Sequence, residues 1–275
     1  MLKVCKFSAD RMLPIGDEPV SWRGIPWYPA IGDGAASNLG SGATHPGLGA
    51  LNMGTSGALR VMKKGRIAKA PFGLFAYRVD ASRYLVGGAI SNAGSLHAWG
   101  VRELRLPDDQ AIENALKQRP LPMHGLTVLP FWTAERAPTW NDETKGAITG
   151  IQQDTTALDL LQAVTEASYL RLAAIAGMIA GKKQPRWIIA GGILHSPSSV
   201  QRLANVMGSP LTINPDPEAS LRGAAVFVLE KLGHKVPELK LGSPIQPSAA
   251  IHRVYQAERK RQSALEHLLE RKNGR

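Results

Sequence analysis

The stretch that decides the fold runs from Tyr28 to Arg60 and reads YPAIGDGAASNLGSGATHPGLGALNMGTSGALR. Its order of apolar runs and glycines predicts a strand leading into Asp33 and a helix from about Gly34 to Leu39. A second strand, the turn Gly54-Thr55-Ser56-Gly57 and a third strand through Met62 follow. The stretch therefore predicts two places where small and polar residues follow a strand: Asp33 and the 54–57 turn.

These two places indicate a chemistry. Glycines free the backbone of the 54–57 turn, so that N–H groups beside the hydroxyls of Thr55 and Ser56 can point together at a phosphate. A carboxylate near such a turn, here Asp33, can accept the proton of an attacking hydroxyl. The plainer alternative for Asp33 is a helix N-cap. The pair suggests phosphoryl transfer.

A second glycine feature lies far along the chain. The apolar run Arg186–Ala190 predicts a buried strand that leads into Gly191 and Gly192, and Ser196 with Pro197 opens the next helix. A strand, paired glycines and a helix N-terminus can approach a nucleotide closely. A tight turn without a ligand is the alternative, because two glycines are weak evidence alone.

The remaining pattern predicts an α/β fold, a mixed sheet flanked by helices. Residues 75–80 and 84–90 predict a hairpin, and 155–179 the longest helix, with Glu166 expected to be solvated or capped by a neighbour. The polar 135–140 segment predicts a surface loop fixed by a Glu-Arg ion pair. Residues 1–24 predict an irregular segment, 25–233 the main domain, and 234–275 a linker and a charged C-terminal helix.

The bulk composition narrows the class of protein. The 275 residues, 44% of them hydrophobic, can bury a full core, and a single cysteine excludes an internal disulfide. We find no apolar run of about twenty residues, so we expect a cytoplasmic protein and no membrane span. The net charge of +11 is spread over several small clusters, which favours solvated surface over a nucleic-acid site. No metal-ligand spacing is present.

Five blocks, taken together, resemble the second half of FGGY-family carbohydrate kinases, and their wording is most similar to the gluconate kinases. The blocks are Gly32–Gly40, Met53–Arg60, Gly87–Gly94, Glu135–Asn141, and Ala190–Gly192 followed by Ala219–Ala225. The resemblance covers residues from about 20 to 232. Each block alone is short, and the specificity comes from their order.

The resemblance implies an actin-like, ribonuclease-H-like ATPase domain that uses ATP and Mg2+. It implies that Asp33 is the catalytic base and that Gly54, Thr55 and Ser56 face the nucleotide phosphates. It also implies that the backbones of Gly94, Gly191 and Gly192 lie beside the nucleotide and that Ser196 lies near its base. The metal would travel with ATP rather than occupy a cage of protein ligands.

The family's first domain has no counterpart in this sequence. This difference limits the activity that the resemblance implies for the chain. We therefore expect half of an ATP-dependent sugar kinase that needs a separate first-domain chain, and we expect an apolar docking surface around residues 25–29 and the final helix. A homodimer is a second arrangement. Gluconate is the favoured substrate, with xylulose or another polyol as alternatives. The competing hypothesis is an inactive nucleotide- or nucleic-acid-binding module.

Overall fold

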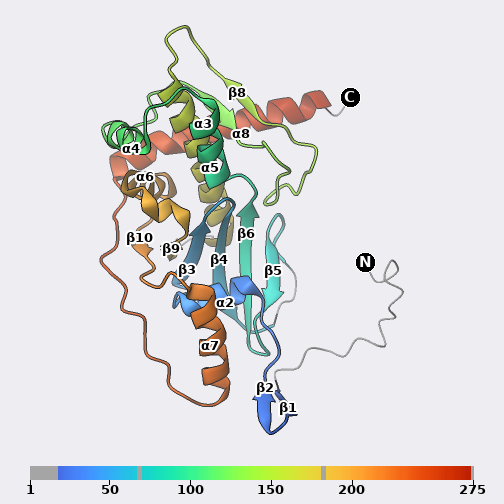
Figure 1. The fold of residues 1–275 in the computed structure, drawn as a ribbon. Coiled ribbons are helices and arrows are strands. Elements are labelled where there is room, and N and C mark those ends of the chain that lie inside the picture. Colours follow the sequence, from blue (N-terminus) through green and yellow to red (C-terminus); the bar gives the residue numbers. More distant parts are fainter. Residues whose placement is uncertain (1–17, 67–69, 181–183, 274–275) are drawn as a thin grey trace.

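The computed structural model describes residues 18–66, 70–180 and 184–273 and is built around a six-stranded mixed sheet (Figure 1). The strand order is β10-β9-β3-β4-β6-β5, with parallel pairing of β3, β9 and β10 and antiparallel pairing of β3, β4, β6 and β5. The strands are β3 (Leu48–Met53), β4 (Gly57–Lys64), β5 (Phe75–Arg78), β6 (Arg83–Ile90), β9 (Arg186–Ala190) and β10 (Leu211–Ile213). The predicted mixed sheet and the predicted hairpin, β5 with β6, are confirmed.

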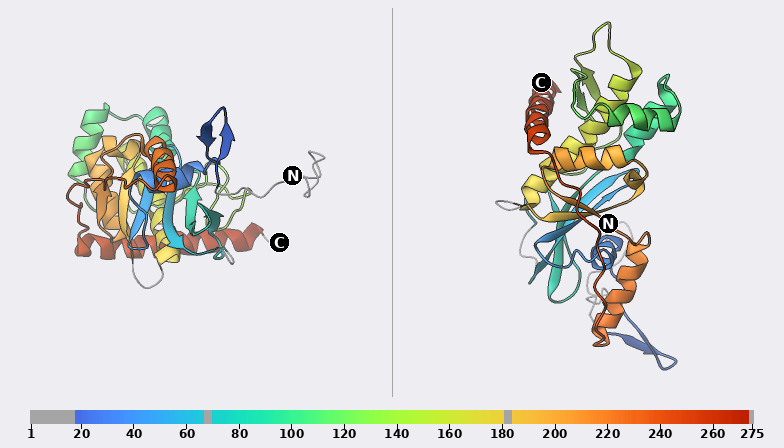
Figure 2. Two further views of the ribbon diagram at one scale, coloured as in Figure 1. Left: turned by 90° about the horizontal axis from the view of Figure 1, so that it is seen from below. Right: turned by 90° about the vertical axis from the view of Figure 1, so that its left-hand side faces the viewer.

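The two faces of this sheet are covered by different helices (Figure 2). Along β4, Leu59 and Val61 pack toward one side and Met62 toward the other, as the alternation of a strand requires. The first face is covered by α5 (Ala157–Ala180), α6 (Pro197–Met207) and α8 (Ala249–Asn273). The second face is covered by α2 (Asp33–Gly40) and α7 (Ala219–Lys231). We call them the α5 face and the α7 face.

Helices α2 and α7 cross in close contact. A Cβ atom added at Gly40 would overlap the backbone of Ala219, and one added at Gly223 would overlap the backbone of Ala36. The small residues of the Ala219–Ala225 block therefore allow the two backbones to touch. This face of α7 therefore packs directly on α2.

Helix α5 is buried on nearly all sides rather than along a single stripe. By length and composition it could cross a membrane, which differs from the expectation that no segment could. However, 78% of its apolar window is buried inside the fold, so α5 is the central helix of the core.

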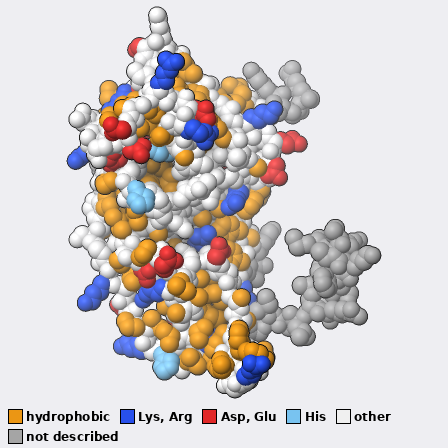
Figure 3. Space-filling view, in the orientation of Figure 1, with side chains coloured by type: hydrophobic (Ala, Val, Ile, Leu, Met, Phe, Trp, Pro, Cys, Tyr) orange, Lys and Arg blue, Asp and Glu red, His pale blue; other side chains and the backbone are white. Residues whose placement is uncertain are grey.

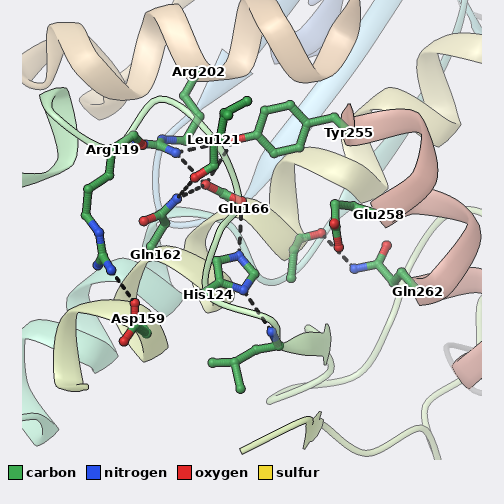
Figure 4. Close-up of polar contacts among 12 residues, drawn as sticks. Arg119, Leu121, His124, Asp159, Gln162, Glu166, Arg202, Tyr255, Glu258 and Gln262 are labelled. Carbon is green, nitrogen blue, oxygen red and sulfur yellow. Dashed lines mark hydrogen bonds and ion pairs between the residues drawn. The ribbon is translucent and has the colours of Figure 1, made fainter. Parts of the chain in front are cut away.

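Of the two alternatives for Glu166, the solvated one is wrong, because its carboxylate lies on α5 at the centre of a buried polar network of neighbouring side chains (Figure 4). Oε1 accepts hydrogen bonds from Arg202 at 2.5 Å, Gln162 at 2.8 Å and Tyr255 at 2.9 Å, and Oε2 lies 3.3 Å from His124. Burial raises the pKa of Glu166, but these partners outweigh burial and lower it. The network joins α5, α6 and α8.

The loop predicted at 135–140 is present, but its ion pair is not a surface feature. Glu135 is buried and pairs with Arg171 of α5, whose guanidinium also binds Glu266 of α8 at 2.6 Å. Thr139 donates to the Glu135 carboxylate at 2.5 Å. The loop is thereby fastened to the core between β7 (Thr127–Leu129) and β8 (Ala147–Thr149), which pair with each other.

The N-terminal part of the described chain forms a small hairpin instead of an irregular segment. Strand β1 (Val20–Trp22) pairs with β2 (Ile25–Trp27) across a two-residue turn at Arg23 and Gly24, both of which have positive φ. The predicted strand into Asp33 therefore ends at Trp27, and the extended 28–32 connection leads into α2. Residues 1–17 lie outside the described part.

Three further helical segments complete the structure near the top of the sheet in Figure 1: α3 (Gly94–Glu103), α4 (Asp109–Lys117) and the short η2 (Gly192–His195). The 234–248 connection is not wholly irregular, since Ile245 forms an isolated bridge with Leu211. It leads into α8, which docks on the α5 face through the fully buried Tyr255.

Candidate functional site

A cavity of about 940 Å³ opens between the β3–β4 turn and the ends of α3, α4 and α6. Five of the eight residues singled out from the sequence line it: Gly54, Thr55, Gly94, Gly192 and Ser196. They come from segments up to 142 positions apart, so the fold brings the glycine turns to one place. Asp33, Ser56 and Gly191 do not line this cavity.

The β3–β4 turn is held by the first residues of α3. The N–H groups of Gly94 and Ser95 donate to the carbonyls of Gly54 and Thr55 at 2.9 and 3.2 Å. A Cβ atom at Gly94 would lie 2.6 Å from the Gly54 oxygen, so only glycine permits this approach. In the described part of the chain, the exposed backbone N–H groups of Thr55 and Ser56 donate to no other group. They are positioned to bind an anion.

The two glycines after β9 have different roles. Gly191 has φ of 103°, and a Cβ atom there would lie 2.5 Å from the Met53 oxygen, so this glycine allows close packing of β9 against the end of β3. A Cβ atom at Gly192 would meet nothing within 4 Å. Gly192 therefore leaves open space in the cavity, whereas Gly191 meets a structural need.

Ser196 caps α6 by accepting from the Ser199 N–H at 3.2 Å, and its own hydroxyl donates to Glu113 of α4 at 2.5 Å. Burial raises the pKa of Glu113, but hydrogen bonds from Ser196 and Ser198 outweigh it and lower the pKa. Nearby, burial lowers the pKa of His97 on α3. Sequence reasoning missed Glu113, because its partners lie more than 80 residues away along the chain.

Asp33 is the exposed first residue of α2, and its Oδ1 accepts from the Gly34 N–H at 2.6 Å. Gly34 lies directly against the side chains of Arg60 and Tyr77, with no room for a Cβ atom. Because Arg60 follows Gly57 by three residues, this point is about 10 Å along β4 from the turn. Asp33 thus lies at the α7 face, outside the cavity lining, and its catalytic role stays a prediction.

Arg60 is a residue of this region that sequence reasoning gave no role. Its Nε and Nη1 atoms are buried and have no hydrogen-bond partner within the described part of the chain. Burial raises the pKa of the adjacent Tyr77 hydroxyl, while the positive charge of Arg60 opposes that shift. Two buried guanidinium nitrogens without a hydrogen-bond partner are costly, so this place fits a ligand that offers acceptor oxygens.

No group of three or more His, Cys, Asp or Glu side chains within residues 18–66, 70–180 and 184–273 could hold a metal ion. The donor sets present suit direct binding of an anion through backbone N–H groups. A divalent ion at this cavity would have to be held mainly by the phosphates of its ligand.

Comparison with known proteins gives one consistent result. Residues 49–229 match the family described as FGGY family of carbohydrate kinases, C-terminal domain. Glycerol kinase of Allorhizobium ampelinum is 25% identical over 232 residues, covering 80% of this chain and 46% of the relative. Gluconokinase of Bacillus subtilis is 27% identical over 231 residues, covering 76% of this chain and 43% of the relative. The chain thus spans about half the length of these curated relatives.

A solved structure of xylulose kinase from Lactobacillus acidophilus superposes with a TM-score of 0.85 at 21% identity, covering 98% of this chain and 60% of that one. At this identity the likeness establishes the fold alone. The predicted actin-like ATPase fold is confirmed, and so is the resemblance to the C-terminal half of the family.

Proposed function

The chain belongs to the FGGY family of carbohydrate kinases, and from that premise we propose that it is the nucleotide-binding half of a sugar kinase. In this proposal it helps transfer the γ-phosphate of ATP to a hydroxyl of a sugar or sugar acid in the cytoplasm, with gluconate as the favoured substrate. The observation that carries the proposal is the cavity, where glycine turns from three parts of the chain converge.

The cavity suits a nucleotide triphosphate in its chemistry. The N–H groups of Thr55 and Ser56 would hold phosphate oxygens, and Gly94, Gly191 and Gly192 keep the surrounding backbone close and free of side chains. Mg2+ bound to the phosphates would neutralise charge that develops during transfer. Ser196, already fixed by capping α6, would lie near the base of the nucleotide.

Asp33 and Arg60 supply the proposed chemistry at the sugar. We assign Asp33 as the general base, since an exposed carboxylate at the start of α2 can reach a hydroxyl delivered from the open side. The Nε and Nη1 atoms of Arg60, which have no hydrogen-bond partner in the described part of the chain, favour an anionic sugar acid such as gluconate over a neutral polyol such as xylulose or glycerol.

The part of the relatives that this chain does not cover would complete the enzyme. Leu221 and Leu229 of α7, Leu232 just beyond it, and Trp22 and Trp27 of the hairpin are exposed. In the orientation of Figure 1, Figure 3 shows hydrophobic side chains gathered over the lower part of the molecule, where α7 and the hairpin lie. Figures 1 and 2 show the hairpin near the end of α7. Apolar area of this kind marks a docking surface. We propose that residues 25–233 form the C-terminal domain and that a first domain covers this surface.

Calorimetric titration of the isolated chain with Mg-ATP tests the nucleotide site. The wild-type chain should bind, and Gly192→Leu should not, because its side chain would enter the cavity without striking the fold. Gly242→Leu, another glycine with open space around it, is the matched control and should bind as the wild type does. A folded wild-type chain without ATP affinity would refute the proposed function.

A further inference from the structure

Glu113 connects two walls of the cavity, α4 and the start of α6, and its partners there lie more than 80 residues away in the sequence. It lies on α4, and its carboxylate accepts hydrogen bonds from the hydroxyls of Ser196 and Ser198 at 2.5 and 2.9 Å. It also accepts from the backbone N–H of Ser198, in the first turn of α6, at 2.8 Å. Both oxygens of the carboxylate are therefore engaged by the start of α6.

This contact occupies a place where a ligand anion could otherwise bind. The N-terminus of a helix attracts negative charge through its free N–H groups and its dipole. Here a side chain of the protein itself satisfies that end of α6 and adds a negative charge to the cavity lining. A phosphate group is disfavoured beside Glu113, and the unpaired N–H groups of Thr55 and Ser56 remain the better place for it.

The contact also fixes the position of α4 as a wall. Ile112 and Leu116, which flank Glu113 on the helix, line the same cavity and pack against Leu161 of α5. Apolar side chains of α4 thus form part of the cavity lining, and this helix is tethered to α6. Such a surface suits a flat, uncharged ring rather than a phosphate chain.

We propose that Glu113 is a positioning residue of the nucleotide site: it latches α4 onto the N-terminus of α6 and so holds the wall against which the base binds. This rests on the proposed function, because it assigns a part of the same site. The latch acts through α4 and α6 and takes no part in phosphoryl transfer. It therefore contributes to binding of a complete nucleotide and not to binding of its phosphates alone.

The test compares two ligands with the isolated chain, Mg-ATP and Mg-tripolyphosphate, which lacks base and ribose. Glu113→Ala should weaken ATP binding roughly tenfold, the size expected when hydrogen bonds to a charged group are lost. Tripolyphosphate affinity should stay unchanged or rise slightly. Ser198→Ala should weaken ATP binding in the same direction, and the double variant should be no weaker than Glu113→Ala, because both changes break one contact.

Gln110→Ala is the matched control, since Gln110 is exposed on α4 and hydrogen-bonds to Asn114 of the same helix. It should bind both ligands as the wild type does. Hydrogen exchange without ligand gives a second measurement: amides 109–117 should exchange faster in Glu113→Ala and in Ser198→Ala. The Ser198 variant keeps the test available if Glu113→Ala fails to fold.

Three results would overturn the inference. Equal loss of ATP and tripolyphosphate affinity in folded Glu113→Ala would show general damage to the site. Unchanged ATP affinity and unchanged exchange in both variants, with normal ATP binding by the wild type, would refute the latch and leave the proposed function standing. A wild-type chain that binds neither ligand would refute both.

Discussion

The two faces of the central sheet differ in how their charged side chains are paired and how their apolar side chains are covered. On the α5 face, the buried guanidinium groups of Arg171 and Arg202 each bind a carboxylate, and apolar residues such as Leu172 are fully covered. On the α7 face, the Nε and Nη1 atoms of Arg60 have no hydrogen-bond partner among the described residues, and Leu221 is 70% exposed. The buried charges of the α5 face are therefore paired within this chain, although single atoms such as Arg171 Nε also lack a partner there. The α7 face, in contrast, leaves two guanidinium nitrogens and an apolar helix surface without a partner in the described part of the chain.

Helices α5 and α7 show why the difference matters. Both are apolar around most of their circumference, which is typical of a helix buried on all sides. Helix α5 is buried in that way, whereas α7 is covered on the face of Gly223 and Val226 and bare on the face of Leu221 and Leu229. The sequence of α7 is therefore suited to a helix that is covered on all sides, and the described part of this chain covers only one side.

The largest expected effect lies in the buried network of the α5 face. Arg202→Met removes the cation that binds Glu166 and should lower the free energy of unfolding by roughly 3–5 kcal/mol, because a buried carboxylate is left poorly compensated. Urea unfolding of the isolated chain measures it. Arg102→Met, at an exposed pair with Glu103, is the control and should change stability by less than about 1 kcal/mol.

The same leucine-to-alanine change should have very different costs on the two helices. Leu172→Ala in α5 should cost about 2–5 kcal/mol of unfolding free energy through lost burial and a cavity. Leu221→Ala in α7 should cost no more than about 0.5 kcal/mol, because the side chain is already exposed. Similar losses in both variants would mean that α7 is covered in solution, for example by a second copy of the chain.

The exposed α7 surface should matter once a first domain is present. Leu221→Asp combined with Leu232→Asp should leave the isolated chain as stable as before but weaken its affinity for an added first domain by roughly thirtyfold, about 2 kcal/mol. Sedimentation or titration with the separately produced domain measures the affinity. Lys235→Asp, an exposed charge change beyond α7, should leave it intact. Equal affinity of the double variant and the wild type would place the interface elsewhere.

The smallest effect is expected at Arg60. Arg60→Met should change the stability of the isolated chain by less than about 1 kcal/mol, because no carboxylate partner is lost. In the completed enzyme it should raise KM for gluconate roughly tenfold, the loss of a charge-assisted hydrogen bond, and leave KM for xylulose unchanged. A parallel rise for both substrates would argue against recognition of a carboxylate by Arg60.

The elements that the sequence predicted well are those set by local patterns. The Gly54–Gly57 turn, the strand before Gly191 and the cap at Ser196 each follow from a few neighbouring residues, and the structure brings them to one cavity. The strand into Asp33 failed because the 28–31 run has no neighbouring strand to pair with in the described part of the chain. Local pattern alone does not supply a pairing partner.

The residues that the sequence could not place depend on distant partners. Glu166 was expected in solvent or capped by a neighbour, because a lone glutamate on a helix is usually exposed, and only the fold brings Arg202 and Tyr255 to it. Arg60 lies in the Met53–Arg60 block but received no role. Its buried nitrogens have no hydrogen-bond partner in the described part of the chain, and only the structure shows this. Glu113 gave no signal for the same reason.

The most direct test of the account is complementation. Gluconate phosphorylation is measured with the isolated chain, with the separately produced first half of the Bacillus subtilis gluconokinase, and with both together. The account predicts that the chain alone binds ATP but does not turn over gluconate, that the mixture does, and that Asp33→Asn lowers the rate of the mixture about 100-fold or more. Full turnover by the chain alone, or an undiminished rate with Asp33→Asn, would contradict it.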